Sequence, residues 1–195
     1  MPLALRPFSL DRVEAAVDRV RDRLARVSHA LERAAIPYAI VGGNAVAIWV
    51  ARVDDGAVRN TRDVDVMIRR EDFAAVRKAL ERQGFVYRHA AGADMFVDGA
   101  SASARDGVHV VFAGEKVRAT EPAPNPDIAM SVDADGVRVL SLEALVRIKL
   151  TAYRDKDRTH LRDLIEVGLV DVGWCDRLPA ELAVRLRHLL DTPEG

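Results

Sequence analysis

Two aspartates, Asp63 and Asp65, flank a single valine at the start of the apolar run Val-Asp-Val-Met-Ile. Residues two apart in an extended strand point to the same side, so we expect both carboxylates on one face, a few ångströms apart. Two carboxylates at that spacing repel each other unless a cation neutralises them, and a divalent ion carrying phosphates commonly does so. The pair therefore predicts a site for Mg²⁺ or Mn²⁺ with Asp63 and Asp65 as ligands.

About twenty residues earlier, Gly42 and Gly43 follow the short apolar segment Tyr-Ala-Ile-Val, and Asn44 opens an apolar helical segment. Glycines remove side chains, so a phosphate can approach the backbone, and the start of a helix directs unbonded N–H groups at an anion. The Asn44 amide can also donate to a phosphate oxygen. This turn predicts a nucleotide-binding element made of Gly42, Gly43 and Asn44.

The order of these features is more specific than any one of them. The segment IVGGNAVAIWVARVDDGAVRNTRDVDVMI, residues 40–68, resembles the nucleotidyltransferase superfamily with the DNA-polymerase-beta-like fold, in which a Gly-Gly or Gly-Ser turn precedes an acid-hydrophobe-acid strand. The resemblance implies an α/β (α+β) fold in which helices flank a small mixed sheet. It also implies transfer of a nucleoside monophosphate from an NTP to a hydroxyl or phosphate, with release of pyrophosphate.

A second segment, LSLEALVRIKLTAYRDKDRTHLRDLIEVGLVD, resembles the C-terminal helices of small prokaryotic AbiEii-type nucleotidyltransferases related to abortive-infection toxins. This resemblance implies that Lys149 faces the nucleotide phosphates, and it suggests a toxin–antitoxin or phage-defence role. Arg154, Arg158 and Arg162 lie one turn apart if the helix continues. The stripe allows two interpretations, a solvated face with intrahelical ion pairs or a surface that meets substrate.

Two positions depart from the pattern: Asn44 stands where many members have Ser, and a carboxylate is replaced on a neighbouring strand. Active members of the superfamily carry a third carboxylate on a neighbouring strand, and here the matching strand, residues 107–112, presents His109. A histidine can act as a base or ligate a softer metal, so His109 is a candidate catalytic residue. The departure also leaves an alternative: a catalytically degenerate relative that binds nucleotide or neutralises a partner. A third interpretation, an α/β scaffold with an incidental Asp-Val-Asp, predicts that the aspartates lie far from Gly43.

The surrounding pattern predicts the elements that hold these residues. Ser9 to about Ala34 is expected as a long helix capped by Ser9, with Val13, Val17, Val20, Leu24, Val27 and Leu31 on one apolar face. Strands are expected at 38–41, 63–68, 85–88, 94–97, 108–112 and 137–140, and helices at 44–50, 69–83, 141–153, 157–167 and 179–190. Residues 114–135 are expected as an irregular extended loop. We expect a nucleotidyltransferase core at 1–140 and a C-terminal helical segment at 141–195 packed on it.

Composition narrows the partners. Lys plus Arg total 29 and Asp plus Glu total 30, a formal net charge of −1 that argues against nonspecific binding of duplex DNA. Cys175 is the single cysteine, which excludes an intramolecular disulfide. The sequence has no apolar stretch of membrane-spanning length and no signal-peptide pattern at its start, so we expect a cytoplasmic protein. Besides NTP, the expected partner is an acceptor such as an RNA end, a protein or a small molecule.

Overall fold

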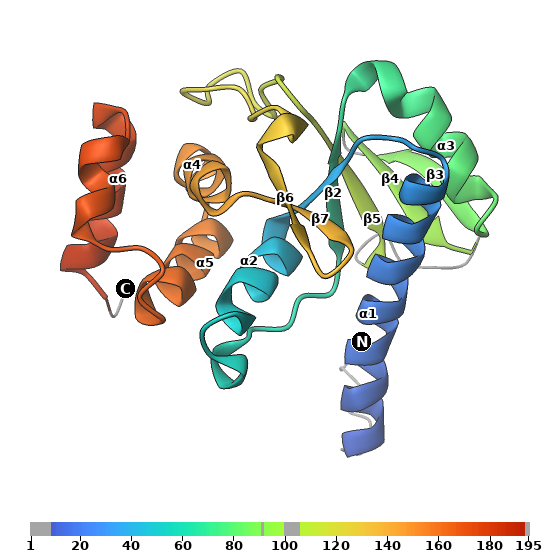
Figure 1. Ribbon diagram of the computed structural model, residues 1–195, viewed down its shortest axis with the longest axis horizontal. Helices are drawn as coiled ribbons and strands as arrows, with labels where there is room; N and C mark the ends of the chain where they lie inside the picture. The colour runs from blue at the N-terminus through green and yellow to red at the C-terminus, as the bar shows by residue number, and fades with distance from the viewer. Residues whose placement is uncertain (1–8, 91, 100–105, 194–195) are drawn as a thin grey trace, which may run out of the picture.

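The computed structural model describes residues 9–90, 92–99 and 106–193. One mixed sheet runs through the middle of the molecule, and helices cover both of its faces (Figure 1). Among the described helices, none is long and apolar enough to cross a membrane.

The sheet has seven strands within the described residues, in the order β3-β4-β5-β2-β1-β7-β6. β2 runs parallel to β5 and β1 parallel to β7, while the other neighbours are antiparallel. The predicted α/β class with a mixed sheet is therefore confirmed. The strands are β1 (Ala39–Val41), β2 (Val64–Ile68), β3 (Phe85–Ala90), β4 (Ala93–Asp98), β5 (Val108–Phe112), β6 (Ser131–Ala134) and β7 (Val137–Leu140).

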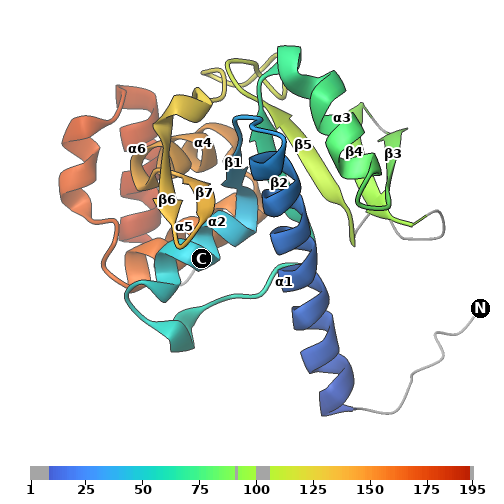
Figure 2. The ribbon, with the colours of Figure 1, turned by 45° about the vertical axis from the view of Figure 1, so that its right-hand side comes forward.

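Helices α1 (Leu10–Arg33) and α3 (Phe73–Glu81) pack on one face of the sheet, and the other face carries α2 (Gly42–Ala51), α4 (Leu142–Ala152), α5 (Asp155–Glu166) and α6 (Ala180–Asp191). Figure 2 shows α1 and α3 on the side of the sheet away from α4 and α6. The apolar cluster on the second face joins β1, β2 and α2 to the helices of the predicted 141–195 segment. Single-turn 3-10 helices occupy Asp55–Ala57, Arg70–Asp72 and Ile128–Met130, and a longer one occupies Val172–Arg177.

Alternation along β2 decides what reaches each face. Val64, Val66 and Ile68 are fully buried in the cluster with α1 and α3. Met67 lies in the opposite cluster, with α2, α4 and α5. Because successive strand residues point to opposite faces, Asp65 shares the face of Met67. The strand thus buries its valines on one side and presents a carboxylate to the helices on the other.

The long N-terminal helix forms, but only part of its predicted apolar face is buried. Val27 and Leu31 are fully buried, whereas Val13 is 52% exposed, because the N-terminal half of α1 extends past the sheet (Figures 1 and 2). Ser9 stands at the N-cap position in an extended conformation but makes no side-chain capping hydrogen bond, so the predicted cap is wrong. Ser141, in contrast, accepts a hydrogen bond from the Ala144 backbone N–H at 3.4 Å, as predicted for α4.

The prediction of an irregular segment at 114–135 is wrong at its C-terminal end. Ser131–Ala134 forms β6, which pairs antiparallel with β7 around a two-residue turn. Asp135 and Gly136 in that turn have φ of +53° and +81°. Two positive φ values match the type I′ turn that suits a tight hairpin. This hairpin forms the edge of the sheet and leads directly into α4.

Candidate functional site

Asp63, Asp65 and His109 converge at one end of the central strands. Each offers a ligand atom, and these atoms all lie within 4.8 Å of one another. His109 Nδ1 is 3.6 Å from Asp65 Oδ1 and 3.7 Å from Asp63 Oδ2. The two His109 separations lie in the range of about 3–4 Å found between ligand atoms that are bonded to one ion at about 2.1 Å, which makes the cluster a candidate site for a divalent cation.

The glycine turn lies directly against this cluster. Gly42 has φ of +67°, and a β-carbon added to it would lie 1.9 Å from Asp65 Oδ2. Position 42 therefore requires glycine for two reasons, its left-handed backbone and the carboxylate that occupies the side-chain space. The interpretation with an incidental Asp-Val-Asp, which separates the aspartates from the glycines, does not fit this contact.

The helix that follows begins without a cap. α2 starts at Gly42 itself rather than at Asn44, and Val41 at its N-cap position provides no side-chain hydrogen bond. Its first turn contains no acidic residue either. The first N–H groups of a helix lack intrahelical partners and carry partial positive charge, so this end favours an anion.

The Asn44 side chain, which was expected to donate to a phosphate oxygen, donates to the protein backbone. Its Nδ2 donates to the Asp63 backbone carbonyl at 2.7 Å, and Thr61 Oγ1 donates to the same carbonyl at 3.3 Å. The Asn44 amide group is thus hydrogen-bonded to the strand that carries the aspartates. In this arrangement Asn44 positions Asp63, while the N–H groups of the α2 turn remain for an anion.

Neighbouring charges keep Asp65 ionised. Burial alone would raise the pKa of Asp65, but the adjacent His109 imidazole and the charges of Lys156 and Lys149 lower it below its usual value. A carboxylate that stays anionic is what a cation ligand requires.

Lys149 lies on α4, and a sharp turn brings α5 back over it. Tyr153 ends α4 in the left-handed region with φ of +47°, and α5 begins two residues later. In a continuous helix, residues 149 and 160 would be about 16 Å apart along the axis. Here Lys149 Nζ lies 2.9 Å from His160 Nδ1.

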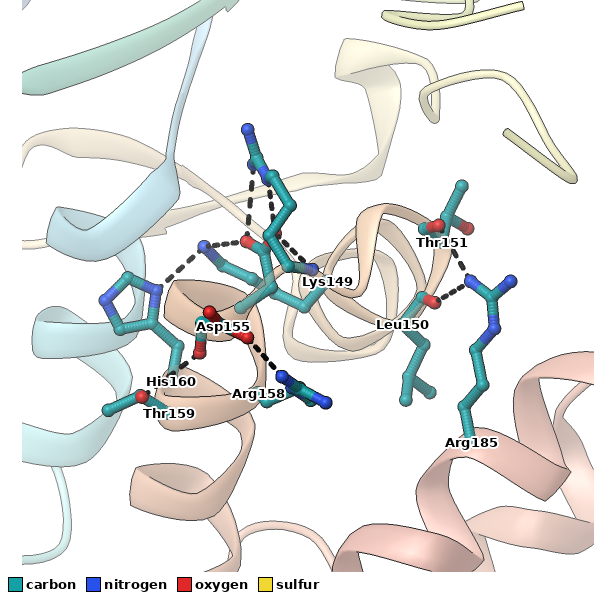
Figure 3. A network of polar contacts seen from close by, with 10 residues as sticks. Lys149, Leu150, Thr151, Asp155, Arg158, Thr159, His160 and Arg185 are labelled. Atoms are coloured by element: carbon teal, nitrogen blue, oxygen red, sulfur yellow. Dashed lines mark hydrogen bonds and ion pairs between the residues drawn. The ribbon is translucent and has the colours of Figure 1, made fainter. Parts of the chain in front are cut away.

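The turn creates a buried ionic network (Figure 3). Lys149 Nζ donates to Asp157 Oδ1 at 3.1 Å, and the two residues are 4% and 1% exposed. The other carboxylate oxygen, Asp157 Oδ2, accepts from Arg154 Nε at 2.7 Å and from the Arg154 backbone N–H at 3.3 Å. A buried carboxylate is therefore satisfied by two cations and by the first turn of its own helix.

The protonation states follow from this packing. Burial lowers the pKa of Lys149, and the neighbouring Asp157 opposes that effect. Burial would raise the pKa of Asp157, but Arg154 and Lys149 hold it below its usual value. Burial and the Lys149 charge lower the pKa of His160 to about 4, so its ring is neutral at physiological pH.

One cleft is bordered by Asp65 and His109 of the metal cluster and by Lys149, Arg154 and Asp157 of the lysine network. It opens between the sheet and the helices α4 and α5, with apolar side chains on its walls and several cations beside the three carboxylates Asp65, Glu121 and Asp157. Its charged or polar lining residues include Asp65, His109, Glu121, Asn125, Lys149, Arg154 and Lys156, and Gly42 borders it. An anionic ligand bound to a cation at Asp65 and His109 would therefore also meet the positively charged side chains of α4 and α5.

Each of the three arginines of the predicted stripe contacts another residue of this chain. Arg154, at the N-cap position of α5, donates to Asp157, Arg158 pairs with Asp155, and Arg162 Nη2 donates to the Thr192 carbonyl at 3.1 Å. All three lie on α5 or at its N-cap position, one turn apart, and each guanidinium group contacts a carboxylate or carbonyl of this chain. These contacts match the interpretation with intramolecular ion pairs.

Sequence reasoning did not single out Thr61, Asp157 or His160 as site residues. The signal for the last two was present, because residues three apart on a helix share a face and both would meet a lysine folded against that face. Thr61 lies within the Thr-Arg-Asp-Val-Asp motif, and its methyl group would lie 2.1 Å from a β-carbon on Gly43. That contact packs the motif against the glycine turn.

Comparisons with known proteins agree with this geometry. The profile of a family described as uncharacterised nucleotidyltransferase matches residues 9–148. A search of curated protein sequences found no match. Among solved structures, the antibiotic-resistance factor ANT(2'')-Ia is similar with a TM-score of 0.56 and 16% identity, covering 91% of this chain and 93% of that one.

Two further structures have the same fold. An antigenic nucleotidyltransferase-like protein from Paracoccidioides brasiliensis is similar with a TM-score of 0.58 and 17% identity, covering 91% of this chain and 89% of that chain. ANT(2'')-Ia in complex with adenylyl-2''-tobramycin gives a TM-score of 0.54 and 16% identity, with 91% and 99% coverage. At sequence identities this low, the similarity shows a shared fold alone.

Proposed function

This chain belongs to the family of nucleotidyltransferases whose profile it matches, and we propose that it transfers a nucleoside monophosphate from an NTP to a hydroxyl or phosphate acceptor. One observation carries the proposal. The donor atoms of Asp63, Asp65 and His109 cluster within 4.8 Å beside a glycine turn that opens an uncapped helix. A bound NTP requires a divalent-ion site next to an anion-binding site. Here the anion-binding site is the group of backbone N–H groups in the first turn of α2, which we call the anion seat.

In the proposed arrangement, Asp63, Asp65 and His109 hold the cation, Mg²⁺ or Mn²⁺, which when bound neutralises phosphate charge and orients the reacting groups. The backbone N–H groups of Gly42 and Gly43 donate hydrogen bonds to phosphate oxygens. Lys149, fixed by Asp157, adds positive charge to the same cleft. Asn44 holds the Asp63 carbonyl and so fixes the register of the first aspartate.

The reaction itself is a substitution at the α-phosphorus. The acceptor oxygen forms a bond to that phosphorus, the bond between the α-phosphorus and the bridging oxygen breaks, and pyrophosphate leaves with the electron pair. The acceptor proton passes to solvent. ANT(2'')-Ia was solved in complex with adenylyl-2''-tobramycin, a molecule that carries an adenylyl group on tobramycin, and this supports the same kind of transfer here. An RNA end, a protein hydroxyl and a small molecule are the acceptor classes to test, the first two with a toxin–antitoxin or phage-defence role in view.

The test is transfer of label from each of the four α-labelled NTPs, with Mg²⁺ or Mn²⁺, to a panel of RNA, protein and aminoglycoside acceptors. D63N and D65N should each abolish transfer, because each removes a charged ligand. D176N, at an exposed aspartate outside the cleft, should retain wild-type transfer. Wild-type rates in both D63N and D65N would refute the metal site.

His109 supports a second candidate function. It occupies the strand position where the family resemblance implies a third carboxylate, and it pairs in register with Asp65. A chain that binds NTP there without transferring it would be a nucleotide-binding or partner-neutralising relative. Calorimetry decides between the two functions: NTP binding with no turnover on the whole acceptor panel would favour this second one.

A further inference from the structure

The His160 ring bridges the buried lysine and the glycine turn. Its Nδ1 lies 2.9 Å from Lys149 Nζ. Its Cε1 would lie 3.3 Å from a β-carbon placed on Gly43, so the ring packs against the first turn of α2. Figure 3 shows the second ring nitrogen pointing away from Lys149, towards the ribbon of α2. A polar ring therefore lies beside Gly43, in the first turn of α2, on the side of α5.

Lys149 decides which ring nitrogen carries the proton. An ammonium group has donors and no acceptor, so His160 Nδ1 must accept the hydrogen bond. A neutral imidazole has one N–H, which in this arrangement is on Nε2. Burial and the Lys149 charge keep the ring neutral, with a pKa of about 4. Nε2 has no hydrogen-bond partner within the described residues, and the side chain is partly exposed.

We propose that His160 is a phosphate-binding residue: its Nε2–H donates to the phosphates of an NTP seated at the first turn of α2, and Lys149 fixes the tautomer that makes this possible. The inference rests on the proposed function. It gives the lysine two actions, a direct charge in the cleft and control of a neutral donor. His160 is thus a ligand-contacting group, and Lys149 positions it.

Two substitutions separate this role from a structural one. In H160Q the side-chain amide reaches the place of Nε2 and can donate to phosphate, but it leaves the place of Nδ1 empty. In H160N the amide stands at the place of Nδ1, so its oxygen can accept from Lys149, but no donor reaches the phosphates. H29Q, at an exposed histidine of α1, is the matched control.

The measurement is titration calorimetry with the α,β-methylene analogues of the four NTPs in MgCl2 at pH 7.5, which prevents turnover. We expect H160N to weaken binding of the preferred analogue by about tenfold, the loss of one hydrogen bond to a charged group. H160Q should stay within about threefold of wild type, and H29Q should equal wild type. Circular dichroism melts establish that each variant is folded.

A wild-type protein that binds none of the four analogues overturns the proposed function and this inference together. A wild-type protein that binds, with H160N equal to wild type and H160Q impaired, overturns the inference alone, because His160 would then only brace Lys149. Nitrogen-15 NMR of the histidine ring provides a second test without variants. It should show a neutral ring protonated at Nε2, and a proton on Nδ1 would refute the proposal.

Discussion

Asp65 on β2 and His109 on β5 are register partners in a parallel strand pair. Both side chains face the side of the sheet that α2, α4 and α5 cover, because the intervening residues on each strand point to the α1 and α3 side. Neighbouring strands lie about 4.8 Å apart, which brings the two side chains within reach of one ion. Asp63 joins them from one residue before β2.

The imidazole ligand should set the metal preference. Carboxylate oxygens suit Mg²⁺, whereas imidazole nitrogen favours later divalent metals, so the wild-type centre should bind Mn²⁺ more tightly than Mg²⁺. H109D restores a three-carboxylate set and should reduce that preference by roughly tenfold. Calorimetric titration with each metal measures the ratio directly. H109N, which offers a weaker donor, should weaken both metals; an unchanged ratio in H109D would show that His109 is not a ligand.

Gly42 should tolerate no side chain. G42A adds a methyl group at the position of the Asp65 carboxylate and places alanine at a positive φ. We expect a loss of about 3 kcal/mol in the free energy of unfolding, with weakened metal binding. Gly168 has a similar φ of +75° with nothing near its missing β-carbon, so G168A should lose only about 1 kcal/mol. Urea denaturation of both variants tests the difference, and equal losses would contradict the close approach to Asp65.

The buried ion pair predicts an asymmetric response to substitution. D157N leaves the Lys149 charge buried without its anion, which should lower the free energy of unfolding by about 3 kcal/mol. D155N changes a carboxylate that is 92% exposed on the same helix, and should change stability by less than about 0.5 kcal/mol. Chemical denaturation compares the two. A loss below about 1 kcal/mol in D157N would show that the network contributes little to folding.

Stability should depend on pH through His160. Its pKa of about 4 in the folded protein lies below the ordinary value of 6.5, so the unfolded chain binds a proton first as the pH falls. The free energy of unfolding should therefore be steady above pH 6.5 and fall between about 6.5 and 4, by at most about 3 kcal/mol. Lys149 and Lys156 add to the effect, and Asp157 and Asp163 reduce it.

Denaturant melts across this pH range measure the slope, with H160N as the comparison. The asparagine carries no titrating group, so the His160 contribution should vanish in it. The same slope in H160N and wild type would assign the acid sensitivity to other groups.

The sequence contained a local signal for the β6–β7 hairpin, whereas it contained none for the limited burial of α1. The β6–β7 hairpin follows from Asp135-Gly136 between alternating strand-forming residues, a strong signal for a two-residue turn. The run of prolines earlier in the same segment favoured an extended loop and obscured it. The N-terminal half of α1 had the periodicity of a buried face, yet periodicity records only that a helix has an apolar side. It does not record how far the sheet beneath that helix extends.

The sequence by itself determined the family, the mixed α/β class, and the proximity of Asp63 to Asp65, because a strand of period two fixes neighbours locally. The family resemblance placed His109 on a neighbouring strand, but only the tertiary structure decided its register beside Asp65, since strand order and register are nonlocal. The same holds for Lys149. The pattern predicted separate helices at 141–153 and 157–167, but only the left-handed conformation of Tyr153 shows how the chain reverses and brings Asp157 and His160 to Lys149. Contacts across a chain reversal depend on the backbone conformation at the turn, which no residue pattern specifies. The sequence therefore did not determine which side chains surround Lys149.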